Sequence, residues 1–201
     1  MLKPAVLRIA LVLAFPLSAE EPGACLAKAA RSQVGVTVGY GGSYVRIPYP
    51  NGDVPMDRGV CTDVVIRAYR AFGVDLQVLV HQDMRRAWKV YPNPWRMMTT
   101  DTNIDHRRVP NLATFFKRHG QVIHDVSDPE RFLPGDLVTW RLASGLPHIG
   151  VVSSQRSVSG TPFIIHNIGS GAREEDVLFA FPISGHYRYL PDPVIHCVTE
   201  H

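Results

Sequence analysis

The hydrophobic pattern changes along the chain, and this change limits the folds that are open to it. Apolar residues recur at helical spacing in four segments: 24–33, 61–72, the segment that Asp75 could cap, and Pro110 to Gly120. Short β-rich runs between turns then follow: 137–142, 149–153, 163–167 and 186–189. Helices followed by strands predict an α+β fold, in which N-terminal helices pack on a small antiparallel sheet.

The first residues of the chain have the pattern of a secretory signal peptide. Lys3 and Arg8 precede an apolar run over 9–17, and Ser18 and Ala19 follow it. The run is too short to span a bilayer comfortably. We therefore expect a signal peptide at 1–19, cleaved after about Ala19, and one domain over 20–201 in a periplasmic or secreted protein. The alternative is an N-terminal helix of the fold or an uncleaved anchor.

The three cysteines of the chain are Cys25, Cys61 and Cys197. Cys25 and Cys197 lie near the two ends of the mature chain, and chain ends often lie close together. An oxidising compartment would let these two form a disulfide and leave Cys61 as the odd thiol. Three reduced, unrelated cysteines remain the alternative, because spacing alone gives no geometry.

Cys61 stands at or just after the start of a predicted helix. The free N–H groups and the positive dipole end of a first helical turn favour a thiolate, so we expect a lowered pKa at Cys61 and a nucleophilic role. A small apolar core residue is the alternative role.

A cysteine nucleophile needs a base, and the strands offer one. His148 opens a predicted strand, and His166 and Asn167 close the next one. Either residue could orient the ring of His148, but only one of the two should face it, because side chains alternate along a strand. A surface role for His148 and a buried, backbone-bonded role for the other two remain the alternatives.

Taken together, these features resemble the NlpC-type cell-wall peptidases of the papain-like cysteine peptidase superfamily. The resemblance covers about residues 24 to 170 and rests on five motifs in the family's order: Tyr40-Gly41-Gly42, Cys61-Thr62-Asp63, Pro134-Gly135-Asp136-Leu137, His148-Ile149-Gly150-Val151 and Phe163-Ile164-Ile165-His166. The chain also resembles a little-characterised family of exported bacterial proteins in that superfamily, through the stretches 51–55, 59–65 and 101–108.

The resemblance implies an exported cysteine hydrolase that cleaves amide bonds in peptidoglycan peptides. Cys61 would be the nucleophile, His148 the base and then the acid, and His166 the orienting residue. The backbone N–H of Cys61 would contribute to an oxyanion hole. An assisting tyrosine from the upstream loop would be Tyr49 in the first place and Tyr40 in the second.

Two departures from the family pattern bear on the substrate. Thr62 and Asp63 replace the family's Ser-Gly, and the Asp63 carboxylate could bind a substrate amine or perturb the thiolate. The second is a longer insertion near 85–109, whose polar residues could line the cleft and read substrate carboxylates, or could form a self-paired structural loop: Asp105, His106, Arg107 and Arg108.

Other functions stay open on the same fold. A thioesterase or acyltransferase would use the same nucleophile, and a non-catalytic cell-wall binding protein would use none of this chemistry. We expect no cofactor and no metal, because no H-x-x-x-H or C-x-x-C spacing occurs. We also expect a monomer without stable membrane insertion. Removal of Lys3 and Arg8 lowers the net charge from +3 to +1, and no basic stripe indicates a nucleic-acid partner.

Overall fold

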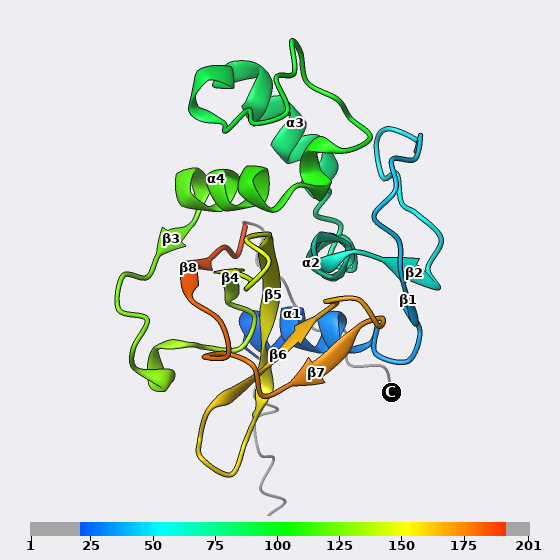
Figure 1. Ribbon diagram of the computed structural model, residues 1–201. Helices are drawn as coiled ribbons and strands as arrows, with labels where there is room; N and C mark the ends of the chain where they lie inside the picture. The colour runs from blue at the N-terminus through cyan, green and yellow to red at the C-terminus, as the bar shows by residue number, and fades with distance from the viewer. Residues whose placement is uncertain (1–20, 192–201) are drawn as a thin grey trace, which may run out of the picture.

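The computed structural model describes residues 21–191, and within them the predicted α+β fold is confirmed (Figure 1). Four helices precede most of the sheet: α1 (Pro22–Arg31), α2 (Cys61–Arg70), α3 (Leu76–Arg86) and α4 (Val109–His119). The Asp75 side chain caps α3 by accepting a hydrogen bond from the N–H of Gln77 at 2.9 Å. Pro110 lies in the first turn of α4, where its missing N–H costs no helical hydrogen bond.

The main sheet has six antiparallel strands in the order β3-β8-β4-β5-β6-β7. Their bounds are β3 (Gln121–Val122), β4 (Leu137–Arg141), β5 (Pro147–Arg156), β6 (Pro162–His166), β7 (Arg173–Glu175) and β8 (Ile183–Arg188). A separate parallel pair joins β1 (Gly39–Tyr40) to β2 (Arg58–Gly59) directly before α2. Three short 3-10 helices complete the regular structure of residues 21–191: η1 (Trp88–Val90), η2 (Asp105–Arg107) and η3 (Pro129–Arg131).

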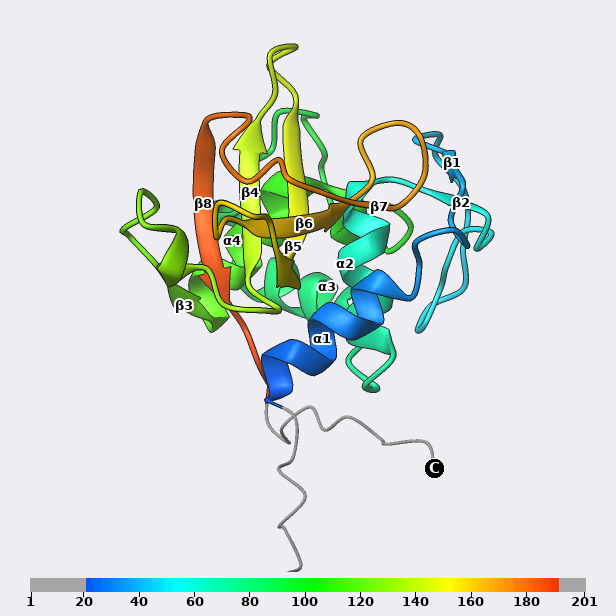
Figure 2. The ribbon, with the colours of Figure 1, turned by 90° about the horizontal axis from the view of Figure 1, so that it is seen from below.

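The two faces of the sheet carry different apolar layers. On one face, Ile149, Val151 and Ile165 join the main core with the buried sides of the helices, and α1, α2 and α4 all contact β5 (Figures 1 and 2). On the other face, Trp140 and Ile164 belong to a smaller apolar cluster. The segments that cover this cluster contain no long helix. This division follows from the alternation of side chains along each strand, and it places the helices on one side of β5.

The shortest strands are absent from the sequence-based prediction. The strands β1, β2, β3 and β7 have two or three residues each, which is too few for an alternating pattern to be recognised. The predicted signal peptide at 1–19 lies outside the described residues. Between residues 21 and 191, no helix combines the length and the apolar character that a membrane crossing needs.

Candidate active site

The thiol of Cys61 lies at the first position of α2, as the sequence predicts. Val60 is the N-cap residue and has an extended backbone, and its N–H donates to Asp63 Oδ2 at 2.7 Å. A carboxylate at the third helical position thus reaches back to the N-cap, which is half of a capping box. A Cβ at Gly59 would stand 3.0 Å from the Cβ of Asp63, so glycine leaves room for this contact.

Strand β5 meets the start of α2 at the sulfur. The backbone N–H of Ile149 in β5 donates a hydrogen bond to the Cys61 thiol. The neighbouring strand β6 ends at His166. Cys61 is 6% exposed and is a free cysteine. The residue after His148 therefore touches the thiol, which brings the strand and the helix together at one point.

The electrostatics of Cys61 differ from the expectation. Burial raises the pKa of the thiol from 9.0 to about 11, and the charge of Asp63 also raises it. Hydrogen bonds from the N–H groups of Ile149, Thr62 and Cys61 lower the pKa by less than burial raises it. The expected lowering by the helix start is therefore corrected: the resting group is a thiol that needs a base.

The two predicted histidines face each other. His148 Nε2 lies 2.8 Å from His166 Nδ1, and both rings are buried. Burial and then the charge of His166 lower the pKa of His148 from 6.5 to about 3. Gly150 permits the approach, because a Cβ there would stand 2.6 Å from Ile164 Cγ2 and 3.2 Å from His166 Cβ. At neutral pH the two rings are therefore in contact with His148 in its neutral form.

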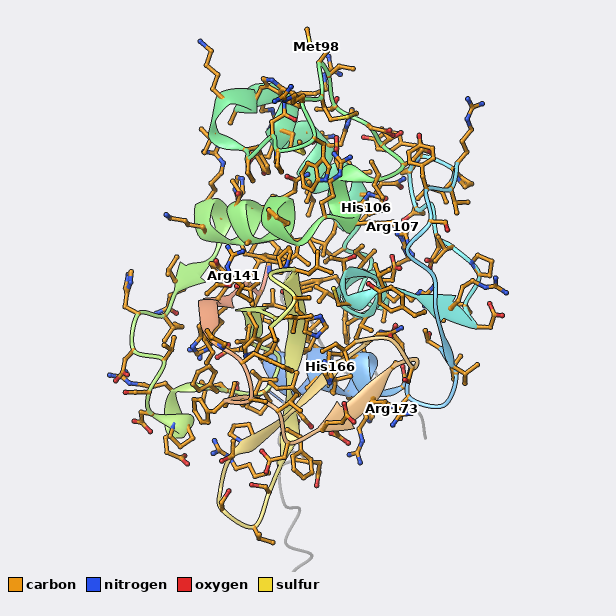
Figure 3. All side chains as sticks on the ribbon, in the orientation of Figure 1. Met98, His106, Arg107, Arg141, His166 and Arg173 are labelled. Carbon is orange, nitrogen blue, oxygen red and sulfur yellow. The ribbon has the colours of Figure 1, made fainter. Side chains whose placement is uncertain are left out.

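Glu175 is a further member of this cluster that the sequence did not indicate. Its Oε2 lies 2.9 Å from Nε2 of His166 (Figure 3 labels His166 on the sheet). Burial lowers the pKa of His166, whereas the hydrogen bond and the charge of Glu175 raise it by less. Recognising Glu175 would have required knowledge of β7, whose three residues give no pattern of their own.

Asn167 has a different set of contacts from His166. Its side-chain amide donates to the carbonyl oxygens of Gly39 at 3.1 Å and Gly59 at 3.0 Å, and its Oδ1 accepts from the N–H of Gly169. These contacts fasten β1 and β2 to the end of β6. The structure thus places His166 against His148 and Asn167 against the backbone that precedes Cys61.

The two candidate tyrosines lie in different places. The pairing of Tyr40 with Gly59 brings Tyr40 to the start of α2. Burial raises the pKa of Tyr40, the neighbouring Cys61 and Asp63 raise it further, and Arg107 lowers it, so its hydroxyl lies within the electrostatic reach of all three. The ring of Tyr49 packs against His81 of α3, with 5.3 Å between the centroids.

Asp105, His106 and Arg107 of the insertion are buried, and Arg108 is partly buried. Arg107 Nε and Nη2 donate to the two carboxylate oxygens of Asp63 at 2.8 and 2.9 Å. Asp105 accepts from the Asp101 N–H and pairs with Arg108, and His106 is 2% exposed. Figure 3 shows His106 and Arg107 on the segment before α4, apart from His166.

These contacts favour the structural alternative for the insertion over the cleft-lining one. The two Asp63 oxygens are taken by Arg107 and by the Val60 N–H, so Asp63 is committed to contacts within the protein. Arg107 of the insertion supports the start of α2, while Asp105 and Arg108 pair within the insertion itself.

Two further expectations concern a metal site and a disulfide between Cys25 and Cys197. Across residues 21–191, no set of three or more His, Cys, Asp or Glu side chains is placed to hold a metal ion. Cys25 is buried in α1. Cys197 lies outside the described residues, so the pairing of Cys25 with Cys197 stays a prediction.

Comparison with known proteins assigns the chain to a family. Residues 27–189 match the family described as "Domain of unknown function (DUF1287)", and the chain belongs to it. It is 54% identical to "Uncharacterized protein YijF" of Escherichia coli (strain K12) over 165 residues, which cover 82% of this chain and 80% of that protein. Among solved structures, "Structure of NlpC1 from Trichomonas vaginalis" has a TM-score of 0.49 and 19% identity, covering 86% of this chain and 46% of that chain.

Proposed function

We propose that this protein is a cysteine hydrolase of papain-like type that cleaves amide bonds in peptidoglycan peptides. The observation that carries the proposal is the buried contact of 2.8 Å between His148 and His166, one residue along β5 from Ile149, whose N–H donates to the Cys61 thiol. A free thiol at a helix start, a base and an orienting group are the parts of a nucleophilic triad. The sequence motifs that resemble NlpC-type peptidases supply the substrate class.

The first chemical step is proton transfer from Cys61 to His148. His166 occupies Nε2 of His148, so Nδ1 is the nitrogen that takes the thiol proton. The sulfur then attacks the carbonyl carbon of the scissile amide, and the imidazolium returns the proton to the leaving amine as the C–N bond breaks. The acyl group stays on Cys61 as a thioester. Water, deprotonated by His148, hydrolyses it to a carboxylic acid and the free thiol.

The start of α2 would stabilise the negative charge that develops on the carbonyl oxygen. The N–H groups of Cys61 and Thr62 lie near the sulfur, since both lower the pKa of the thiol by hydrogen bonding. Such donors form an oxyanion hole when the substrate carbonyl replaces the thiolate as their acceptor. We assign the assisting tyrosine to Tyr40, which lies near Cys61, and not to Tyr49 on His81.

Mass spectrometry of muropeptides tests this proposal. Incubation with the wild-type protein should convert peptidoglycan peptides into two fragments whose masses add up to the substrate plus one water. Cys61→Ala should yield no fragments and should keep its circular dichroism spectrum and unfolding midpoint. Fragments of equal yield with both proteins would rule out Cys61 as the nucleophile.

The same assay separates the other functions. A thioesterase would leave muropeptides intact and hydrolyse simple thioesters in a Cys61-dependent way, since both reactions pass through the same acyl-enzyme. A cell-wall binding protein would sediment with peptidoglycan sacculi and cleave neither substrate. In that case Cys61→Ala would sediment as well as the wild type.

We also propose that residues 1–19 direct the protein out of the cytoplasm. The proposal is supported by the basic start and the apolar run over 9–17. Expression of the full chain with a C-terminal tag, followed by fractionation and N-terminal sequencing, would check it. The expected result is a periplasmic or secreted protein that begins near Glu20. A full-length cytoplasmic protein would contradict export.

A further inference from the structure

Glu175 lies where it can determine which ring nitrogens of His148 and His166 carry a proton. Strand β7 pairs with β6 so that Arg173 lies opposite His166 and Glu175 opposite Ile164. Glu175 is therefore the diagonal neighbour of His166 on the same face of the sheet. Its side chain is 37% exposed, while that of His166 is 2% exposed. The carboxylate thus joins the buried pair to solvent.

The hydrogen-bond chain fixes where each proton lies. A carboxylate only accepts, so Nε2 of His166 must carry a proton and donate to Glu175 at 2.9 Å. A neutral imidazole then has a lone pair on its other nitrogen, so Nδ1 of His166 accepts from Nε2 of His148 at 2.8 Å. Nδ1 of His148, at the far end of this series of hydrogen bonds from Glu175, is left with a lone pair.

Both rings must be neutral for this assignment, and their surroundings favour that state. Burial and the neighbouring ring lower the pKa of His148 to about 3, and burial lowers the pKa of His166 as well. At neutral pH each ring therefore exists as one of two tautomers. The choice between tautomers decides whether His148 has a lone pair or a proton on Nδ1, the nitrogen that does not contact His166.

We propose that Glu175 is a positioning residue that fixes the tautomers of His166 and His148, so that His148 Nδ1 is held as a proton acceptor for the Cys61 thiol. The assignment of a base rests on the proposed function, whereas the tautomers themselves do not. Without Glu175, His166 can carry its proton on Nδ1. His148 must then carry its own proton on Nδ1, where it cannot act as a base.

Glu174 provides a matched control on the same strand. It points away from His166, because neighbouring residues of a strand face opposite sides. Its carboxylate accepts from Ser153 and pairs with Arg31 at 3.0 Å. Glu174→Gln therefore makes the same chemical change as Glu175→Gln, but at a residue that does not contact His166.

Long-range ¹H–¹⁵N correlation spectra of the histidine rings test the tautomers directly. In the full-length protein at pH 7, His148 and His166 should each show a protonated Nε2 and an unprotonated Nδ1. Glu175→Lys, which only donates, should reverse both assignments, and Glu174→Gln should change neither. Unreversed tautomers in Glu175→Lys, with the fold retained, would overturn the inference.

Kinetics on the cleaved muropeptide give a second readout. Glu175→Gln keeps an acceptor oxygen and should lose about threefold in kcat/KM, and Glu175→Ala, where water can partly replace the carboxylate, about 30-fold. Glu175→Lys should lose roughly 10³- to 10⁴-fold, as expected for a base in the wrong tautomer. Equal losses in all three variants would indicate a merely structural role and overturn the proposal.

The two tests fail separately. If the tautomers reverse in Glu175→Lys but the wild type cleaves no muropeptide, the proposed function is wrong and the role of Glu175 in fixing the tautomers stands. If muropeptides are cleaved in a Cys61-dependent way but the tautomers do not depend on Glu175, the proposed function stands and this inference is wrong.

Discussion

Nε2 of His148 lies 2.8 Å from Nδ1 of His166, and the two rings meet edge to face with 5.0 Å between their centroids. One atom must donate and the other must accept, so the proton state of one ring constrains that of the other. The rings stand on adjacent strands, β5 and β6, whose backbone pairing holds them in place. The contact is therefore part of the sheet and does not depend on a flexible loop.

The first prediction concerns the orienting residue. His166→Ala should lower kcat/KM for muropeptide cleavage by about 100-fold or more, because His148 loses the partner that orients its ring. The variant should still give a single cooperative unfolding transition. An unchanged kcat/KM would show that the pair has no part in the reaction.

Asn167→Ala should mainly change stability. Its amide donates to two carbonyl oxygens, those of Gly39 and Gly59, and losing donors to such groups costs about 1–3 kcal/mol each. Urea denaturation should therefore show a free energy of unfolding lower by roughly 2–6 kcal/mol. A loss of activity larger than that of His166→Ala, at unchanged stability, would assign the orienting role to Asn167.

Part of this site could be predicted from the sequence. Helical spacing and strand runs placed Cys61 at a helix start and the two histidines on successive strands, because these elements are long enough to show their period. Glu175 could not be found, since β7 is short. The pair of Asp63 and Arg107 joins residues 44 positions apart, and sequence reasoning has no access to such contacts. The raised pKa of Cys61 follows from tertiary burial, which the sequence does not reveal for the same reason.

The pH dependence of thiol alkylation follows from that raised pKa. With a thiol pKa of about 11, the iodoacetamide rate at Cys61 should rise about tenfold per pH unit from pH 7 to 10 and level off above about pH 11. Cys61→Ser supplies the background from other thiols. In urea the rise should level off nearer the ordinary value of 9.0. A constant rate from pH 5 upward would instead reveal a preformed thiolate–imidazolium pair.

Acid stability should reflect the lowered pKa of His148. The unfolded chain binds a proton at this histidine below about pH 6.5, whereas the folded protein does so only below about pH 3. Its contribution is thus complete above pH 6.5 and is lost as the pH falls towards 3, at up to about 1.4 kcal/mol per pH unit.

Urea midpoints at pH 7, 5 and 4 measure this effect. His148→Gln, which cannot gain the proton, should show a shallower acid loss than the wild type. His124→Gln removes an exposed histidine and should follow the wild type. Parallel curves for the wild type and His148→Gln would contradict the lowered pKa.

The buried ion pair of Asp63 and Arg107 should control the stability of the segment that carries Cys61. Both side chains are almost fully buried, 3% and 2% exposed, and removing one partner leaves a buried charge uncompensated. Arg107→Met should therefore lower the free energy of unfolding by about 3–5 kcal/mol in urea denaturation.

The double variant Asp63→Asn/Arg107→Met separates charge from packing. It removes the stranded carboxylate charge and should recover part of the loss, so the two changes should not be additive. Arg131→Met, an exposed arginine elsewhere, should change the unfolding free energy by less than about 0.5 kcal/mol. Additive losses in the double variant would mean that Asp63 is held by the Val60 N–H alone. The insertion would then add nothing to the placement of the nucleophile.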